Sequence, residues 1–308
     1  MSENQLFPVA GISGDQRVRV FRRVFDATGE YEGMEVDAYV VISERYVVVL
    51  DTMLCPADVA SMMSSVAGEL AGRAVLCVDS HADWDHAWGN AYFTGEHSAP
   101  IIAHEYCLTR LQSQEAADEL DEFQHKYSLF RDVRLVPPSI TFAQRMIIHG
   151  GDLTIELKSA PGHHPDQLVA WIPELRLLLA FDAVENPLPL MDDQRCVPDM
   201  FITLEQLIAL QPERVLCSHG KSTSPRLVAD NLRYIREIER RSRLLLQKHR
   251  PTGDELEQAS TLIAYPFDEV FAGTSDEIDR TFYAQGHEHN IRAILRWLME
   301  SCPAPQTR

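Results

Sequence analysis

The stretch SHADWDHAWGN at residues 80–90 decides the fold that we expect for this chain of 308 residues. It places His81, Asp83, Asp85 and His86 close together in one loop. Imidazole and carboxylate groups together are a donor set that suits divalent transition metals. The stretch directly follows RAVLCVD, a short apolar run typical of a buried strand. The sequence therefore predicts a metal-binding loop at the carboxyl end of a strand.

Three further side chains of the same kind follow predicted strands later in the chain. They are His163 in APGHHPDQ, Asp182 in LLLAFDAVEN and His219 in LCSHGKS. An isolated histidine at any one of these positions would most often be an ordinary core or loop residue. Each of these residues, however, comes just after an apolar strand, which delivers its side chain to one rim of a sheet. Four histidines and three aspartates are enough ligands for two ions that share a bridging carboxylate.

The texture of the chain changes from strands to helices along its length. Residues 17–51 are rich in β-branched residues and read as strands. Residues 139–159 read as a hairpin that turns at Gly150, and 213–220 contain the last convincing strand. After Pro225 the pattern is helical to the end. Two runs of strands, each with its own helices, predict two sheets packed face to face under outer helices.

Composition and charge exclude several classes of partner. The formal net charge is −18, and the sequence has no run of Lys or Arg that would follow a phosphate backbone. No apolar run approaches the length of a membrane span, and the N-terminus lacks the pattern of a secretory signal. We therefore expect a cytoplasmic protein that acts on a small-molecule substrate and binds neither nucleic acid nor a membrane.

The order of these motifs resembles that of the metallo-β-lactamase superfamily. Asp51 ends an early strand in VVVLDTM, and the loop at 80–90 follows it. His163 in PGHH, Asp182 in AFDAV and His219 in SHG then occur in the superfamily's order. Each motif alone would be weak, but the five together are specific, and the resemblance covers about two thirds of the chain.

The resemblance implies a fold and a division of the chain. The implied fold mixes strands and helices (α+β or α/β) in a four-layer αβ/βα sandwich. Residues 1–225 would form the metallo-β-lactamase-like domain, and residues 226–308 a C-terminal helical extension.

The resemblance also assigns roles to residues. Asp51 and Asp85 are expected to be catalytic, Asp51 by orienting the ligand loop from outside the metal shell. The expected reaction is hydrolysis of a small ester-like substrate (a lactone, thioester or phosphoester) by a hydroxide that bridges two divalent ions. The implied ligands are His81, Asp83 and His163 for the first ion, Asp85, His86 and His219 for the second, and Asp182 as the bridge.

Asp83 departs from the common motif, which carries histidine at this position. A third carboxylate lowers the net positive charge of the site, and its hard oxygen donors favour Fe or Mn over Zn. The flavodiiron branch of the superfamily carries glutamate here, and HHPDQL at residues 163–168 is similar to a loop of that branch. The alternative function is therefore a di-iron protein that reduces or binds O2 or NO. An incompletely filled site, or one that binds without turnover, is also left open.

The C-terminal extension carries one more candidate. Tyr283 in FYAQGHEHN is expected to be catalytic if these helices line the pocket, where its hydroxyl would contact the substrate or an oxyanion. The same helices would equally serve as a homodimer interface. The sequence does not separate these two roles.

Overall fold

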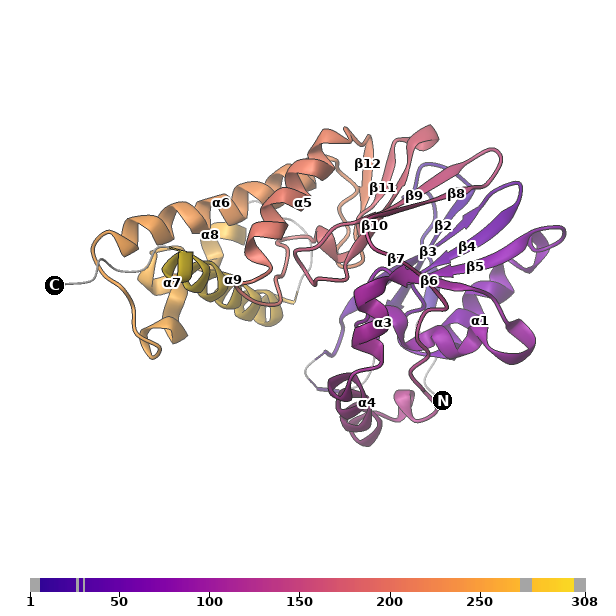
Figure 1. The fold of residues 1–308 in the computed structure, drawn as a ribbon, viewed down its shortest axis with the longest axis horizontal. Helices are drawn as coiled ribbons and strands as arrows, with labels where there is room; N and C mark the ends of the chain where they lie inside the picture. The colour runs from indigo at the N-terminus through magenta and orange to yellow at the C-terminus, as the bar shows by residue number, and fades with distance from the viewer. Residues whose placement is uncertain (1–5, 26–27, 30, 272–278, 302–308) are drawn as a thin grey trace.

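The computed structural model describes residues 6–25, 28–29, 31–271 and 279–301. Its strands form two mixed sheets (Figure 1). In spatial order, the first sheet consists of β1 (Leu6–Pro8), β2 (Val18–Val24), β3 (Glu35–Ile42), β4 (Tyr46–Leu50), β5 (Ala74–Val78), β6 (Ile101–His104) and β7 (Ile140–Phe142). The second sheet consists of β12 (Arg214–Leu216), β11 (Leu177–Leu179), β10 (Leu168–Ile172), β9 (Thr154–Ser159) and β8 (Arg145–His149).

The helices cover the outer faces of both sheets. In Figure 1, α1, α3 and α4 lie beside the first sheet, while α5, α6 and α9 lie at the other end of the molecule. The bounds are α1 (Pro56–Ser65), α2 (Trp84–Ala87), α3 (Glu105–Leu111), α4 (Gln114–Lys126), α5 (Val197–Ala209), α6 (Arg226–Leu246), α7 (Ala259–Leu262), α8 (Phe267–Phe271) and α9 (Arg280–Ser301). The expected sandwich with helices at the C-terminal end is confirmed.

Both sheets mix antiparallel and parallel pairs. Strands β1 to β4 pair antiparallel, and β4 to β7 pair parallel. In the second sheet β8 to β11 pair antiparallel and β12 joins β11 in parallel. The parallel pairs matter for the site, because parallel strands end at the same edge of a sheet.

The expected hairpin over residues 139–159 is right at its turn and wrong at its start. Strands β8 and β9 pair on either side of Gly150, as expected. Residues Ile140–Phe142 instead form β7, which pairs with β6 in the first sheet. The chain therefore crosses from one sheet to the other at Ala143 and Gln144, a step that a local strand pattern does not reveal.

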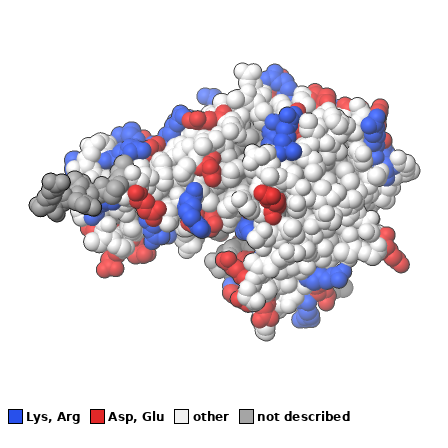
Figure 2. Space-filling view, in the orientation of Figure 1, with Lys and Arg blue, Asp and Glu red and all other residues white. Residues whose placement is uncertain are grey.

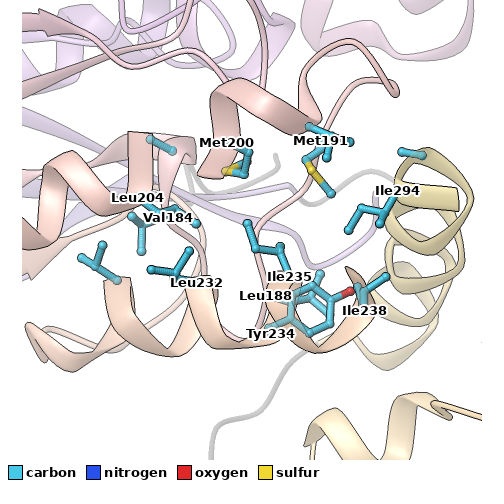
Figure 3. Packing of buried hydrophobic residues seen from close by; sticks show 14 of the residues in the cluster. Val184, Leu188, Met191, Met200, Leu204, Leu232, Tyr234, Ile235, Ile238 and Ile294 are labelled. Carbon is cyan, nitrogen blue, oxygen red and sulfur yellow. The ribbon is translucent and has the colours of Figure 1, made fainter. Parts of the chain in front are cut away.

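The core has three layers of apolar side chains. One layer lies between the sheets and includes Tyr39, Leu50 and Leu168, all fully buried. A second packs α1 and aromatic side chains such as Trp88 on the first sheet. The third packs α5, α6 and α9 on the outer face of the second sheet; Figure 3 shows its side chains converging from these helices.

The surface and the helices set limits on partners. On the face shown in Figure 2, basic side chains are scattered between acidic ones rather than gathered into one patch. Among the residues that the structure describes, no helix combines the length and the apolar character that crossing a bilayer requires.

Candidate metal centre

The ends of four strands bring the predicted ligands to one rim of the sandwich. Asp51 directly follows β4, and His81 follows β5, its parallel neighbour. Asp182 and His219 follow β11 and β12, which are also parallel neighbours. His163 lies in the loop between β9 and β10. The two sheets therefore contribute side chains to the same place from sequence positions far apart.

Asp182 lies at the centre of the cluster. Its Oδ2 atom is 3.1 Å from His86 Nε2 and 3.4 Å from His219 Nε2. The same oxygen is 3.7 Å from His81 Nε2 and 3.8 Å from His163 Nε2. One carboxylate thus faces all four imidazoles, which is the position that a bridging ligand requires.

Two groups of donors flank this central carboxylate, each with two imidazoles and one aspartate. Asp83 Oδ2 is 3.4 Å from His81 Nε2 and 3.7 Å from His163 Nε2. On the other side, Asp85 Oδ2 is 3.2 Å from His219 Nε2 and 3.5 Å from His86 Nε2. The structure therefore brings all seven predicted ligands together, in the groups that the sequence indicated: His81, Asp83 and His163; Asp85, His86 and His219; with Asp182 beside His81 and His86.

Each imidazole is oriented by a partner on its outer nitrogen. His81 Nδ1 is 2.9 Å from Ser80 Oγ, and His86 Nδ1 is 2.8 Å from Asp51 Oδ2. Two backbone carbonyls do the same for the others: the Leu190 oxygen lies 3.1 Å from His163 Nδ1, and the Glu35 oxygen lies 2.9 Å from His219 Nδ1. With Nδ1 engaged in this way, every ring directs Nε2 inward, as metal-binding histidines do.

The inner atoms of the cluster fit a divalent metal. The Nε2 atoms of His81, His86 and His163 and the Oδ1 atom of Asp182 are buried without a hydrogen-bond partner. Buried polar atoms are rarely left unsatisfied, so they point to a ligand that the protein binds. Donors about 2.1 Å from a tetrahedral ion would lie about 3.4 Å apart, close to the separations seen here.

A family comparison identifies the chain. Residues 32–219, more than half of its length, match the family model of the metallo-beta-lactamase superfamily. This chain is a member of the metallo-beta-lactamase superfamily. No curated protein sequence matches it.

Solved structures show the same superfamily fold. A family protein from Thermus thermophilus aligns with a TM-score of 0.63 at 14% identity, covering 92% of this chain and 94% of that chain. A metallo-beta-lactamase from Pontibacter korlensis gives 0.58 at 17% identity, covering 74% and 98%. FIM-1 from Pseudomonas aeruginosa, in its mono-zinc form, gives 0.56 at 14%, covering 74% and 93%. The wider coverage of the Thermus protein reaches into the C-terminal helices.

Asp51 occupies the position expected of it in the superfamily motif. Its carboxylate accepts hydrogen bonds from the backbone N–H of Ser80 (2.6 Å) and the Ser80 hydroxyl (2.9 Å), besides its contact with His86. It is fully buried and has a φ of 68°. Asp51 thus ties the start of the ligand loop to the ring of His86.

Asp83 has further partners that the sequence did not reveal. Its Oδ1 atom is 2.5 Å from Arg110 Nη2, and its Oδ2 atom is 3.2 Å from His164 Nε2. Burial alone would raise the pKa of Asp83, but attraction by His164, Arg110 and His81 outweighs it and holds that pKa well below its usual value. The residue that departs from the superfamily motif is therefore an ionised carboxylate.

Tyr283 lies near the superfamily site but contacts it through another residue. Its side chain is buried, and its hydroxyl donates to Glu185 Oε2 at 3.3 Å. Glu185 is itself buried; burial first, and then the nearby Asp182, raise its pKa to about 7. The expected contact of Tyr283 with a substrate stays a prediction, as does a catalytic role of Asp85 beyond ligation.

Proposed function

We propose that this superfamily member is a metal-dependent hydrolase of a small ester-like substrate: a lactone, a thioester or a phosphoester. One observation carries the proposal: Asp182 Oδ2 lies 3.1–3.8 Å from the Nε2 atoms of four outwardly anchored histidines. Members of the superfamily are typically hydrolases of this kind. Two divalent ions held here would polarise the scissile bond and activate water near neutral pH.

The chain's own residues set up this chemistry. Asp182 and the two flanking groups hold the inner donors within a few ångströms of each other before any ion arrives, which lowers the ordering cost of binding. Asp51 and Ser80 fix the ring planes of His86 and His81 from outside. Asp85 and Asp182 supply negative charge that offsets part of the charge of two ions.

A second candidate is a di-iron protein that reduces or binds O2 or NO. It is favoured by Asp83, whose oxygen stands in the first group of donors where the common motif has an imidazole. Oxygen donors favour iron or manganese over zinc. Such a protein would need a separate reductase as an electron donor.

Metal analysis beside a substrate screen separates the two functions. Protein purified without added metal is analysed for Zn, Fe and Mn, and is then assayed with lactone, thioester and phosphodiester substrates. We expect about two equivalents of metal and hydrolysis of one substrate class. Two equivalents of iron with no hydrolysis, together with O2 consumption under an artificial reductant, would refute the hydrolase.

Asp83→His tests whether Asp83 tunes the metal. Replacing the carboxylate by an imidazole restores the common motif, so the bound metal should shift from Fe or Mn toward Zn. Asp132→His, at an exposed aspartate, is the matched control. Unchanged metal content and activity in the Asp83→His variant would show that Asp83 is not a ligand.

A further inference from the structure

The carboxylate of Asp83 is divided between two environments. Its Oδ2 atom faces the inner nitrogens of His81 and His163, at 3.4 and 3.7 Å. Its Oδ1 atom points the other way and accepts a hydrogen bond from Arg110 Nη2 at 2.5 Å. Only one of the two oxygens is therefore presented to the first group of donors.

The guanidinium of Arg110 binds a second carboxylate with its other arm. Arg110 Nη1 donates to Asp166 Oδ1 at 2.6 Å. Asp166 is fully buried, and its Oδ2 atom accepts from the backbone N–H of Ala82 at 2.9 Å. Asp166 follows His163 in the loop between β9 and β10, and Ala82 lies between His81 and Asp83. One arginine thus links the two loops that supply the first group.

The position of Arg110 is fixed by its helix. Arg110 lies near the end of α3, which directly follows β6, and its neighbours Cys107 and Leu111 are buried against the first sheet. A planar guanidinium presents several donors in a fixed fork, which suits two carboxylates at once better than the single ammonium of lysine does. The contact is therefore specific in geometry as well as in charge.

We propose that Arg110 is the positioning residue that makes Asp83 a usable one-oxygen ligand where the common motif has histidine. Aspartate is shorter than the glutamate of the flavodiiron branch, and a free carboxylate turns about its own axis. By holding Oδ1, Arg110 aims Oδ2 at the first metal position and keeps the His163 loop at the distance that Asp83 requires. It also places a positive charge behind the additional negative one. The inference rests on the proposed metal-dependent function.

The expected effect is a selective loss of the first metal. Groups that orient metal ligands from outside typically change metal affinity by about 10- to 100-fold when they are removed. Arg110→Met should weaken one of two binding steps by that factor and leave the other step, at Asp85, His86 and His219, unchanged. At limiting metal the variant should hold one ion where the wild type holds two.

The experiment is a titration of metal-free protein with Co2+, followed by its optical spectrum and by equilibrium dialysis. The variants are Arg110→Met, Arg110→Lys, Asp166→Asn and the double variant Arg110→Met with Asp166→Asn. The double variant removes the buried charge that Arg110→Met alone would leave unpaired. Arg134→Met, at an exposed arginine bonded to Thr94, is the matched control. Circular dichroism and thermal unfolding check that each variant folds.

The variants are repeated in an Asp83→His background, which makes a double-mutant cycle. If Arg110 acts through Asp83, its loss should weaken the first binding step in the Asp83 background and have little effect in the other, and Arg110→Lys should restore the step only in part. A double variant that binds two ions as tightly as the wild type would overturn the proposal. So would an equal effect in both backgrounds.

Metal binding is measured here without turnover, so the two hypotheses fail separately. A protein that binds two ions and hydrolyses nothing refutes the hydrolase and leaves the role of Arg110 supported. A hydrolase whose first binding step ignores Arg110 refutes only the positioning role.

Discussion

At the residue scale, Asp51 offers a clean test of how the ligand loop is held. Its φ of 68° lies in the left-handed region, which asparagine tolerates as well as aspartate does. Asp51→Asn therefore removes the charge and one acceptor without straining the backbone. We expect metal affinity to fall by about 10- to 100-fold, because the ring of His86 loses its carboxylate partner. Isothermal titration of the metal-free variant measures this change.

Ser80→Ala is the companion variant for Asp51. It removes the hydroxyl that bonds both Asp51 and His81 but keeps the backbone N–H that donates to Asp51. Its loss of affinity should be the smaller of the two. An Asp51→Asn protein that binds metal like the wild type would contradict the role assigned to Asp51.

A second residue-scale prediction concerns the buried carboxyl of Glu185. Burial raises its pKa from an ordinary value of 4.5 to about 7 in the folded protein. Between these values the unfolded chain has lost the proton while the folded protein still holds it. This group therefore makes the metal-free protein less stable as pH rises from about 4.5 to about 7, by about 1.4 kcal/mol per unit of pKa difference.

Glu185→Gln removes this pH dependence. Urea unfolding of both metal-free proteins at pH 5 and pH 8 gives the comparison. The wild type should lose more stability between the two pH values than the variant does. An equal loss in both proteins would mean that Glu185 does not keep its proton in the fold.

Among individual residues, sequence reasoning found the ligands and missed their supports. The seven ligands and Asp51 follow apolar strands in a fixed order, so a pattern along the chain identifies them. Arg110, Asp166 and Glu185 carry no such signal, because their partners are distant in sequence and meet them only in three dimensions. Arg110 sits on an ordinary short helix, and only its contact with Asp83 gives it importance.

At the scale of elements, the loop that carries His163 depends on Gly162. Gly162 has a φ of 148°, and a Cβ atom there would lie 2.7 Å from the Cα atom of Met200 on α5. Gly162→Ala should therefore push the loop away from α5 and displace His163. We expect a loss of about 2–5 kcal/mol in unfolding free energy and weaker metal binding. Thermal unfolding and Co2+ titration measure the two effects.

Gly253→Ala is the matched control for Gly162. Gly253 is exposed, and a Cβ atom added there would have no neighbour within 4 Å. That variant should unfold like the wild type and bind metal normally. If Gly162→Ala behaved in the same way, the close approach of the loop to α5 would not be needed for the site.

Element prediction failed where an element is short and its partner is distant. Residues Ile140–Phe142 have a strand-like sequence that is consistent with either sheet, and only pairing with β6 assigns them to the first. The longer strands were predictable because each keeps a run of β-branched residues between turns. Local sequence sets the type of an element better than it sets its neighbour.

At the scale of the whole molecule, the C-terminal helices share a core with the second sheet. Leu232 and Ile235 of α6, and Ile294 of α9, pack with Met200 of α5 and Val215 of β12 (Figure 3). Burying one such side chain contributes about 1.5–3 kcal/mol. A chain that ends at residue 225 would expose this face, so we expect it to aggregate or to lack cooperative unfolding.

The truncation also tests the expected division of the chain at residue 225. Expression of residues 1–225 beside the full chain, followed by size-exclusion chromatography and thermal unfolding, gives the result. A soluble fragment with a sharp transition would mean that the sandwich folds without the added helices. The expected homodimer stays a prediction, which light scattering on the full chain would check.

The origin of the ligands has one more consequence, for the order of events in folding. His81 to His86 extend from the first sheet, whereas His163, Asp182 and His219 extend from the second. An ion that binds all of them acts as a clasp that closes only after the two sheets have docked. Since a ligand that binds only the native state lowers the population of open forms, chelation should speed hydrogen exchange first at this seam. The metal would thus guard the junction of two halves that the chain builds separately.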